Sequence, residues 1–236
     1  MTAAEKLSAL RARMDERGLD AYIVVSADAH QSEYVSDYWR GRAWLSGFDG
    51  SAGKVAVIRD EAGLWTDGRY FIQAENQIKG SGITLYKMDV DGVPELNEWL
   101  KEKLPENGRL GFDGRTVSVF DFDGMKKDLA SKKIAFEYGA DLLGEIWNDR
   151  PPLPTSPAFE HAAQFSGASR MEKLKAVREE MRKKGADYYL VASLDDIAWL
   201  LNIRGNDVPM TPVVYAYCLI GMDCAYLFVD SAKIGA

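Results

Sequence analysis

The chain has 236 residues, of which 47% are hydrophobic and 28% are charged, and its formal net charge is −7. This length suits one or two domains, and the composition suits a globular protein with a sizeable apolar core. The acidic balance argues against nucleic-acid binding, which needs clustered lysine and arginine to neutralise phosphates. No run of 18 or more apolar residues occurs, so we expect no membrane partner.

The first 150 residues predict helices that alternate with strands. Leu7, Leu10 and Met14 lie on one face of an amphipathic helix, and Gly18 follows where a C-cap glycine belongs. The patterning then predicts strands at residues 20–26, 54–58, 63–66, 83–88, 109–112 and 133–136, and helices at residues 70–78, 93–104 and 119–129. Alternation of this kind predicts an α/β domain.

A proline-rich segment marks the clearest boundary, because four of the eight prolines fall within residues 149–157. Proline fixes φ and donates no backbone hydrogen bond, so this segment predicts an extended linker. We therefore expect a first domain over residues 1–150, a linker over 151–160 and a second domain over 161–236.

The second domain begins as a repeat of the first. Residues 172–174 repeat Glu-Lys-Leu of residues 5–7, and the same offset of 167 pairs helix, glycine and strand residues without a gap: Met181 with Met14, Gly185 with Gly18, Tyr189 with Tyr22, Val191 with Val24. Residues 213–220 and 225–229 predict a hairpin like the one at 54–66. Fewer than 80 residues are then available for a fold that takes about 150 in the first copy. We expect an incomplete second copy.

Several short motifs invite functional interpretations that their spacing does not support. The loop Gly47–Lys54 has five residues between Gly47 and Gly53, whereas a phosphate-binding P-loop has four, so a tight turn before a strand is favoured. Asp28, His30 and Ser32 occupy one short loop, whereas catalytic triads converge from distant segments. A structural loop is therefore the expected role of these three residues.

Metal sites and disulfides are not favoured either. The Asp-x-Asp-Gly starts at residues 89 and 121 lack the glutamate that a calcium loop needs at its twelfth position. The chain has two histidines and no H-E-x-x-H motif, so we expect no metal ligands in it. Cys218 and Cys224 are expected as reduced thiols, which suits a cytoplasmic protein without a signal peptide.

The segment Trp65–Phe71 offers one candidate binding residue. Asp67-Gly68 predicts a turn after a strand, and Arg69 then follows at a helix start. A guanidinium there can present a planar pair of donors to a carboxylate or a peptide carbonyl. An ordinary surface ion pair is the alternative, and physical chemistry alone favours that alternative.

Several segments together resemble the N-terminal region of cytosolic Xaa-Pro aminopeptidases, in the creatinase/prolidase family of pita-bread metallopeptidases. They run in family order over nearly the whole chain: Asp28–Tyr34, Ser46–Gly53, Trp65–Phe71, Ile146–Pro151, Leu194–Asn202, Arg204–Val208. The resemblance implies two related domains with a ribonuclease-H-like core, namely a mixed sheet flanked by helices, the second copy being incomplete here.

The same resemblance implies an activity for the parent protein rather than for this chain. Family members carry a third, catalytic domain with two metal ions, typically manganese, and remove the residue that precedes proline at a peptide N-terminus. That domain is expected to lie beyond this chain and to be its intramolecular partner. By position in the motif, Arg69 is the implied substrate-binding residue, and a homodimer is common in the family.

Two other functions stay open at this point. Some pita-bread relatives have lost catalysis and bind proteins, so the chain could belong to a non-catalytic binding or assembly module. An independent small-molecule binder of the α/β class is the third possibility.

Overall fold

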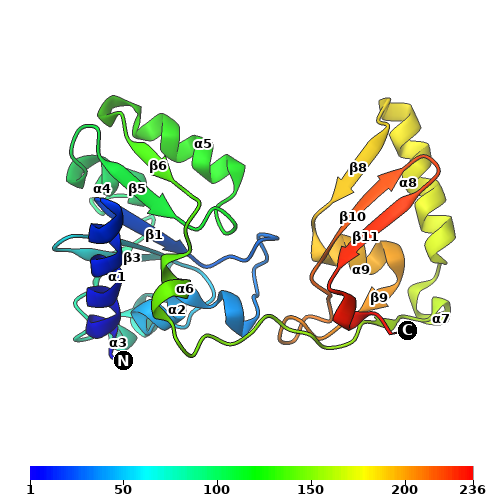
Figure 1. Cartoon of the computed structure of the whole chain (residues 1–236), viewed down its shortest axis with the longest axis horizontal. Coiled ribbons are helices and arrows are strands. Elements are labelled where there is room, and N and C mark those ends of the chain that lie inside the picture. The colour runs from blue at the N-terminus through cyan, green and yellow to red at the C-terminus, as the bar shows by residue number, and fades with distance from the viewer. Residues whose placement is uncertain (236) are drawn as a thin grey trace. The chain divides into compact units, whose positions relative to one another are not determined.

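The computed structural model describes residues 1–235 and separates the chain into two compact units (Figure 1). The first unit comprises Met1–Glu33 with Tyr38–Pro151, and the second comprises Tyr34–Asp37 with the chain from Pro152 onward. None of the helices within residues 1–235 has the length and apolar character needed to cross a membrane.

A six-stranded mixed sheet forms the centre of the first unit, in the order β4-β3-β2-β1-β5-β6. Its strands are β1 (Ala21–Val25), β2 (Lys54–Ile58), β3 (Ala62–Thr66), β4 (Thr84–Lys87), β5 (Arg109–Phe112) and β6 (Ala135–Glu137). Only β2 is antiparallel to its neighbours, whereas the pairs β1–β5, β5–β6 and β3–β4 are parallel. Five strands therefore end at one side of the sheet, which we call the carboxyl edge.

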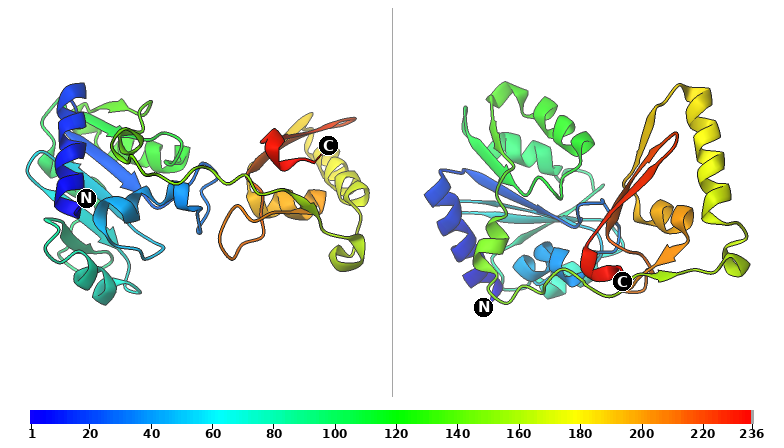
Figure 2. Two further views of the ribbon diagram at one scale, coloured as in Figure 1. Left: turned by 60° about the horizontal axis from the view of Figure 1, so that its bottom comes forward. Right: turned by 45° about the vertical axis from the view of Figure 1, so that its right-hand side comes forward.

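Helices cover both faces of this sheet (Figures 1 and 2). One face packs against α1 (Ala3–Arg17), α2 (Gly41–Ser46), α3 (Phe71–Gln77) and α6 (Leu142–Ile146). The other packs against α4 (Leu96–Lys103) and α5 (Val119–Asp128). Side chains alternate along β1, so that Tyr22 joins the first cluster and Ile23 the second. The predicted mixed sheet flanked by helices is confirmed.

The second unit holds a three-stranded sheet in the order β11-β10-β8. Its elements are β8 (Tyr188–Val191), β10 (Ala216–Gly221), β11 (Ala225–Val229), α7 (Ala163–Ser166), α8 (Arg170–Lys184) and α9 (Leu194–Leu201). A separate pair joins β7 (Phe159–Glu160) to β9 (Ile203–Arg204). Single 3-10 turns lie at Asp37–Trp39, Ala130–Lys132 and Ser231–Lys233. Both α8 and α9 pack on one face of the three-stranded sheet (Figure 2).

The predicted repeat is confirmed down to the ends of its helices. Helices α1 and α8 each have 15 residues and each begin with a capping box, formed by Thr2 with Glu5 and by Ser169 with Glu172. Each helix ends at a glycine in the left-handed region, which a side chain would strain.

The contacts made by these helices recur as well. Arg11 Nε donates to the carbonyl of Ile58 at 2.9 Å, and Arg178 Nε donates to that of Gly221 at the same distance. The two carbonyls occupy matching sheet positions, because Ile58 pairs with Ala21 and Gly221 pairs with Tyr188. The helix–strand portions of the two units therefore share one fold.

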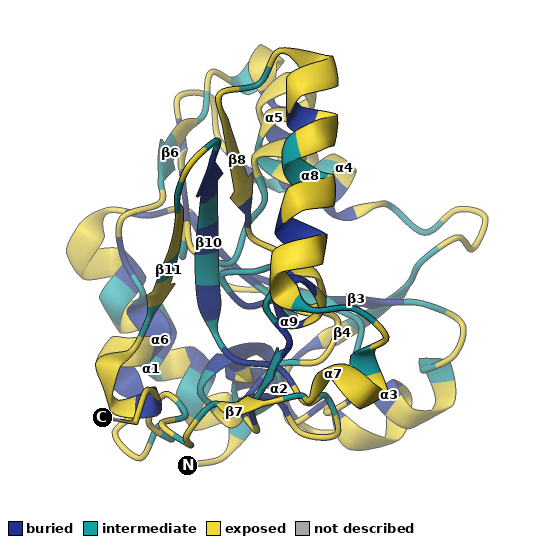
Figure 3. Ribbon diagram, turned by 90° about the vertical axis from the view of Figure 1, so that its right-hand side faces the viewer, coloured by how far each residue is buried: buried dark blue, intermediate teal, exposed yellow. Residues whose placement is uncertain are grey.

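The two copies differ in whether the sheet face opposite the paired helices α1 and α8 is covered. In the first unit Ala21, Ile23 and Trp65 are buried beneath α4 and α5. Their counterparts in the second unit, by sheet register, are 66%, 59% and 56% exposed: Tyr188, Leu190, Phe228. Figure 3 shows β8 and β11 as exposed strands on either side of the more buried β10. Within residues 1–235 no helices cover this aromatic face, which we call the open face.

Candidate functional site

Two identical turns stand at the carboxyl edge of the first unit, one after β3 and one after β5. Each has the sequence Asp-Gly-Arg, as Asp67–Arg69 and as Asp113–Arg115. In each, the aspartate Oδ1 accepts from the arginine backbone N–H and Nε, both at 3.0 Å, and Oδ2 accepts from Nη2 at 2.8 Å. The aspartate therefore fixes the guanidinium plane without help from the rest of the fold.

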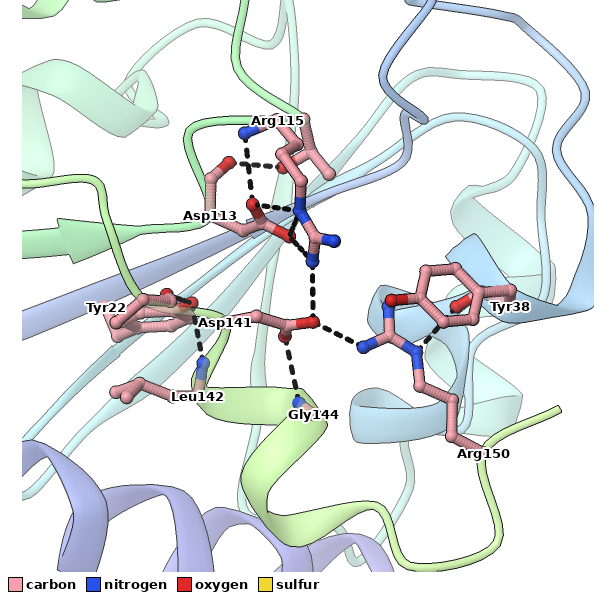
Figure 4. A network of polar contacts seen from close by, with 10 residues as sticks. Tyr22, Tyr38, Asp113, Arg115, Asp141, Leu142, Gly144 and Arg150 are labelled. Carbon is pink, nitrogen blue, oxygen red and sulfur yellow. Dashed lines mark hydrogen bonds and ion pairs between the residues drawn. The ribbon is translucent and has the colours of Figure 1, made fainter. Parts of the chain in front are cut away.

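The two arginines differ in what else they contact. Arg115 also donates to Asp141 at 2.8 Å, and its guanidinium lies 5.0 Å from the centre of the Trp39 ring. Asp141 in turn accepts from Arg150, which donates to the carbonyl of Tyr38 (Figure 4). Arg115 is thus part of a network that joins the turn after β5 to Asp141 and Arg150, near the end of the first unit.

Arg69 lies 5.3 Å from the centre of the Tyr70 ring, but within residues 1–235 its hydrogen bonds go to Asp67 alone. Its side chain is 63% exposed, and within residues 1–235 no hydrogen bond engages its Nη1. Hydrogen bonds from the Arg69 guanidinium lower the pKa of Asp67, and the same bonds raise the pKa of Arg69. The guanidinium is therefore charged, oriented and open to solvent on one side. The sequence-predicted site residue stands where an acceptor from outside could reach it.

A cavity of about 390 Å³ opens beside Arg69 at the carboxyl edge. Its apolar wall comes from β1, α4, α5 and the end of β4: Ile23, Val25, Met88, Leu96, Met125. Charged side chains that also line it are Glu33, Lys54, Asp67, Arg69 and Asp121. Ligands of open α/β sheets bind at this side, where the strands end. The cavity therefore has the location and lining of a small binding site.

The glycine-rich loop that borders this cavity is held from within by a buried arginine. Arg42 is 4% exposed, and its guanidinium donates to the carbonyls of Phe48 and Gly50 and to Ser26 Oγ. Burial lowers the pKa of Arg42 to about 10. The loop directs carbonyl groups at a cation, whereas a phosphate cradle presents N–H groups to an anion. The expected tight turn is wrong: residues 47–53 form an open, bent loop before β2, because the guanidinium of Arg42 binds its carbonyls and no backbone hydrogen bond closes a turn within residues 48–53.

Asp28 organises its own loop, as expected from its position. Its Oδ1 accepts the backbone N–H groups of His30 at 2.8 Å and Ser32 at 3.0 Å, and Asp28 is fully buried. A carboxylate bound in this way shapes a turn and does not orient a histidine side chain.

Within residues 1–235 no three His, Cys, Asp or Glu side chains are grouped so that they could hold a metal ion. Cys218 and Cys224 are free thiols, and burial raises the pKa of Cys218.

Sequence reasoning missed three residues that shape this edge: Arg42, Arg115 and Asp141. The second Asp-Gly-Arg tripeptide was a usable signal, because it repeats the first and follows a predicted strand. No local signal identifies Arg42 or Asp141, since their partners are brought to them by the fold.

Comparison with known proteins gives a family match for each unit. Two related families, both described as Creatinase/Prolidase N-terminal domain, match the chain, one over residues 6–138 and the other over residues 149–236. Aminopeptidase P2 of Arabidopsis thaliana is 42% identical over 235 residues, which are 98% of this chain and 33% of that protein. Xaa-Pro aminopeptidase 1 of Dictyostelium discoideum is 39% identical over 98% of this chain and 38% of its own length. The chain thus spans about a third of the length of these relatives.

A solved structure shows the same fold. The X-prolyl aminopeptidase of Caenorhabditis elegans, described as a cytosolic enzyme with a di-nuclear active site, superposes with a TM-score of 0.94 at 35% identity. The match covers 100% of this chain and 40% of that enzyme. The family matches and these relatives lead to one conclusion: the chain belongs to the creatinase/prolidase N-terminal domain family and corresponds to the N-terminal region of Xaa-Pro aminopeptidases.

Proposed function

We propose that this chain is the non-catalytic N-terminal part of a cytoplasmic Xaa-Pro aminopeptidase, and that it helps to shape access to an active site on a separate catalytic domain. The observation that carries the proposal is the match over 98% of this chain and only 33% of an aminopeptidase P. The two units account for the N-terminal third of such an enzyme and leave the chemistry to the remainder.

The metal ions of the parent enzyme are proposed to bind in its catalytic domain and not in this chain. Within residues 1–235 the acidic and histidine side chains form no group that could bind one. We propose that the catalytic domain of the parent holds two metal ions, which we expect to be manganese, in keeping with the di-nuclear site named for the Caenorhabditis elegans enzyme. No step of the reaction is assigned to a residue of this chain.

The open face supports the view that the second unit continues into a larger structure. An apolar sheet face of this kind is covered in the first unit by α4 and α5. Leu190 and Phe228 are already partly buried, so burying the rest of each side chain would stabilise the protein by about 1–2 kcal/mol. We propose that a helical layer like α4 and α5, contributed by the parent protein, covers this face.

A binding or assembly module without catalysis is the second candidate, and the exposed aromatic strands are the observation that favours it. A homodimer of the parent would be one such assembly. In that case the open face would be covered by another protein molecule instead of by the parent's own chain.

We propose that Arg69 contacts the peptide substrate. The proposal rests on its exposure, its fixed plane and its open Nη1. In the parent enzyme, Arg69→Ala is expected to lower kcat/KM for a short Xaa-Pro peptide by about 10- to 100-fold, the range for losing a hydrogen bond to a charged group. Thermal stability should be unchanged, because the Asp67 pair is exposed.

Steady-state kinetics and a thermal melt on the same preparations test this role. The matched control is Arg59→Ala, an exposed arginine at the opposite end of β2, which should leave kcat/KM unchanged. Equal kcat/KM for Arg69→Ala and the unaltered enzyme would refute the assignment of Arg69.

A further inference from the structure

The rim of the cavity beside Arg69 has more hydrogen-bond donors than free acceptors. Asp67 is engaged by three hydrogen bonds from Arg69, and Asp121 accepts from the Ser118 hydroxyl at 2.7 Å. The cations are less engaged. Lys54 lies 3.8 Å from Asp121, beyond hydrogen-bond distance, and Arg69 keeps Nη1 unbound within residues 1–235. Glu33 is the remaining carboxylate on the rim, and the ammonium of Lys54 and Nη1 of Arg69 together carry more N–H donors than it can accept. A carboxylate from a ligand would accept the remaining donors.

The interior of the cavity calls for an apolar group. Its walls are formed by Ile23, Val25 and Met125, among others, and a volume of about 390 Å³ holds a large aliphatic or aromatic side chain with its backbone. Methionine side chains adapt to ligands of different shape, and Met88 and Met125 both line this space. A suitable ligand is thus apolar at one end and anionic beside it.

We propose that this cavity binds the C-terminal residue of a short peptide, with the apolar side chain inside and the α-carboxylate between Lys54 and Arg69. The choice of a peptide rests on the proposed function, whereas the anionic and apolar requirements rest on the cavity itself. A site of this kind would recognise a free C-terminus and would favour short peptides. Glu33, exposed on the same rim, opposes the carboxylate and limits the affinity.

Peptide binding to this chain can be followed through the methyl groups of Met88 and Met125 by NMR. The probes are acetyl-Pro-Leu with a free carboxylate, its C-terminal amide, and acetyl-Pro-Gly. We expect acetyl-Pro-Leu to shift both methyl signals with a millimolar Kd. The amide should bind at least tenfold more weakly because it lacks the charge, and acetyl-Pro-Gly at least fivefold more weakly because it leaves the cavity empty.

Variants of the rim separate this site from adventitious binding. Lys54→Gln should weaken acetyl-Pro-Leu at least fivefold, Glu33→Gln should tighten it, and Val117→Trp should block it by filling the cavity. Lys79→Gln, an exposed lysine away from the cavity lining, is the matched control and should change nothing. The amide-proton spectrum of each variant verifies that it folds.

Three results would overturn the proposal: no methyl shift with acetyl-Pro-Leu, equal binding of acid and amide, or preference for Pro-Leu-amide, whose free amine would instead select Glu33. Any of these would leave the kinetic effect of Arg69→Ala in the parent enzyme intact. Conversely, normal peptide binding to this chain together with unchanged kcat/KM for Arg69→Ala in the parent enzyme would refute the proposed contact of Arg69 with the substrate and would leave the cavity proposal standing.

Discussion

Replacing Arg42 with methionine is expected to lower the free energy of unfolding of the first unit by about 2–4 kcal/mol, because it removes charge-assisted hydrogen bonds to buried neutral acceptors. The arginine is 4% exposed, and three of its nitrogens donate to Ser26 and to two loop carbonyls. Methionine fills part of the volume but leaves these acceptors without donors, and a buried unsatisfied polar group is costly.

Urea denaturation followed by tryptophan fluorescence measures the Arg42 effect. Arg59→Met is the control, because Arg59 is exposed and its replacement should stay within about 0.5 kcal/mol of the unaltered chain. Arg42→Met should also increase proteolysis of residues 47–53, since the guanidinium holds that loop. A loss below about 1 kcal/mol would mean that the loop is held by its glycine conformations instead.

Asp141→Asn is expected to cost about 2–3 kcal/mol, because the change removes the anion that two arginines share. The carboxylate accepts from Arg115 at 2.8 Å, from Arg150, and from the backbone N–H of Gly144 at 2.9 Å (Figure 4). Burial acts to raise the pKa of Asp141, but the hydrogen bonds and the charges of both arginines outweigh it and lower the pKa overall.

The direction of that shift fixes the pH dependence. A carboxyl group whose pKa is lower in the folded state stabilises the protein fully above its unfolded pKa, about 3.9, and loses this contribution as pH falls through its folded pKa. The difference in unfolding free energy between the unaltered chain and Asp141→Asn should therefore be largest near pH 7 and should shrink toward pH 2. A difference that grows on acidification would contradict the assignment. Asp123→Asn, on the exposed side of α5, is the control.

Sequence patterns predicted those parts of the fold that carry signals within a few residues, such as helix caps and apolar periodicity. Helix α1 and its copy α8 are marked by caps, an apolar stripe and a terminal glycine, so the offset of 167 residues held from helix to strand. The short helices α2 and α6 escaped prediction because six and five residues are too few to show a period. They are helical because α1 packs against both of them.

The candidate site, too, could be predicted from the sequence only where a local signal marks it. Arg69 was identified by its motif, and its fixed plane follows from an aspartate two residues earlier. The network around Asp141 joins residues 38, 115, 141 and 150, which only the fold brings together. The cavity depends on where β1, β4, α4 and α5 end relative to one another. Tertiary arrangements of this kind leave no trace in local periodicity.

We propose that this chain supplies structure and one substrate contact to a peptidase whose chemistry lies elsewhere. The decisive experiment compares hydrolysis of a Xaa-Pro peptide, in the presence of manganese, by the chain alone and by a protein extended to the full length of its relatives. We expect no turnover above buffer for the chain alone and clear turnover for the extended protein. Turnover by the chain alone would overturn this proposal.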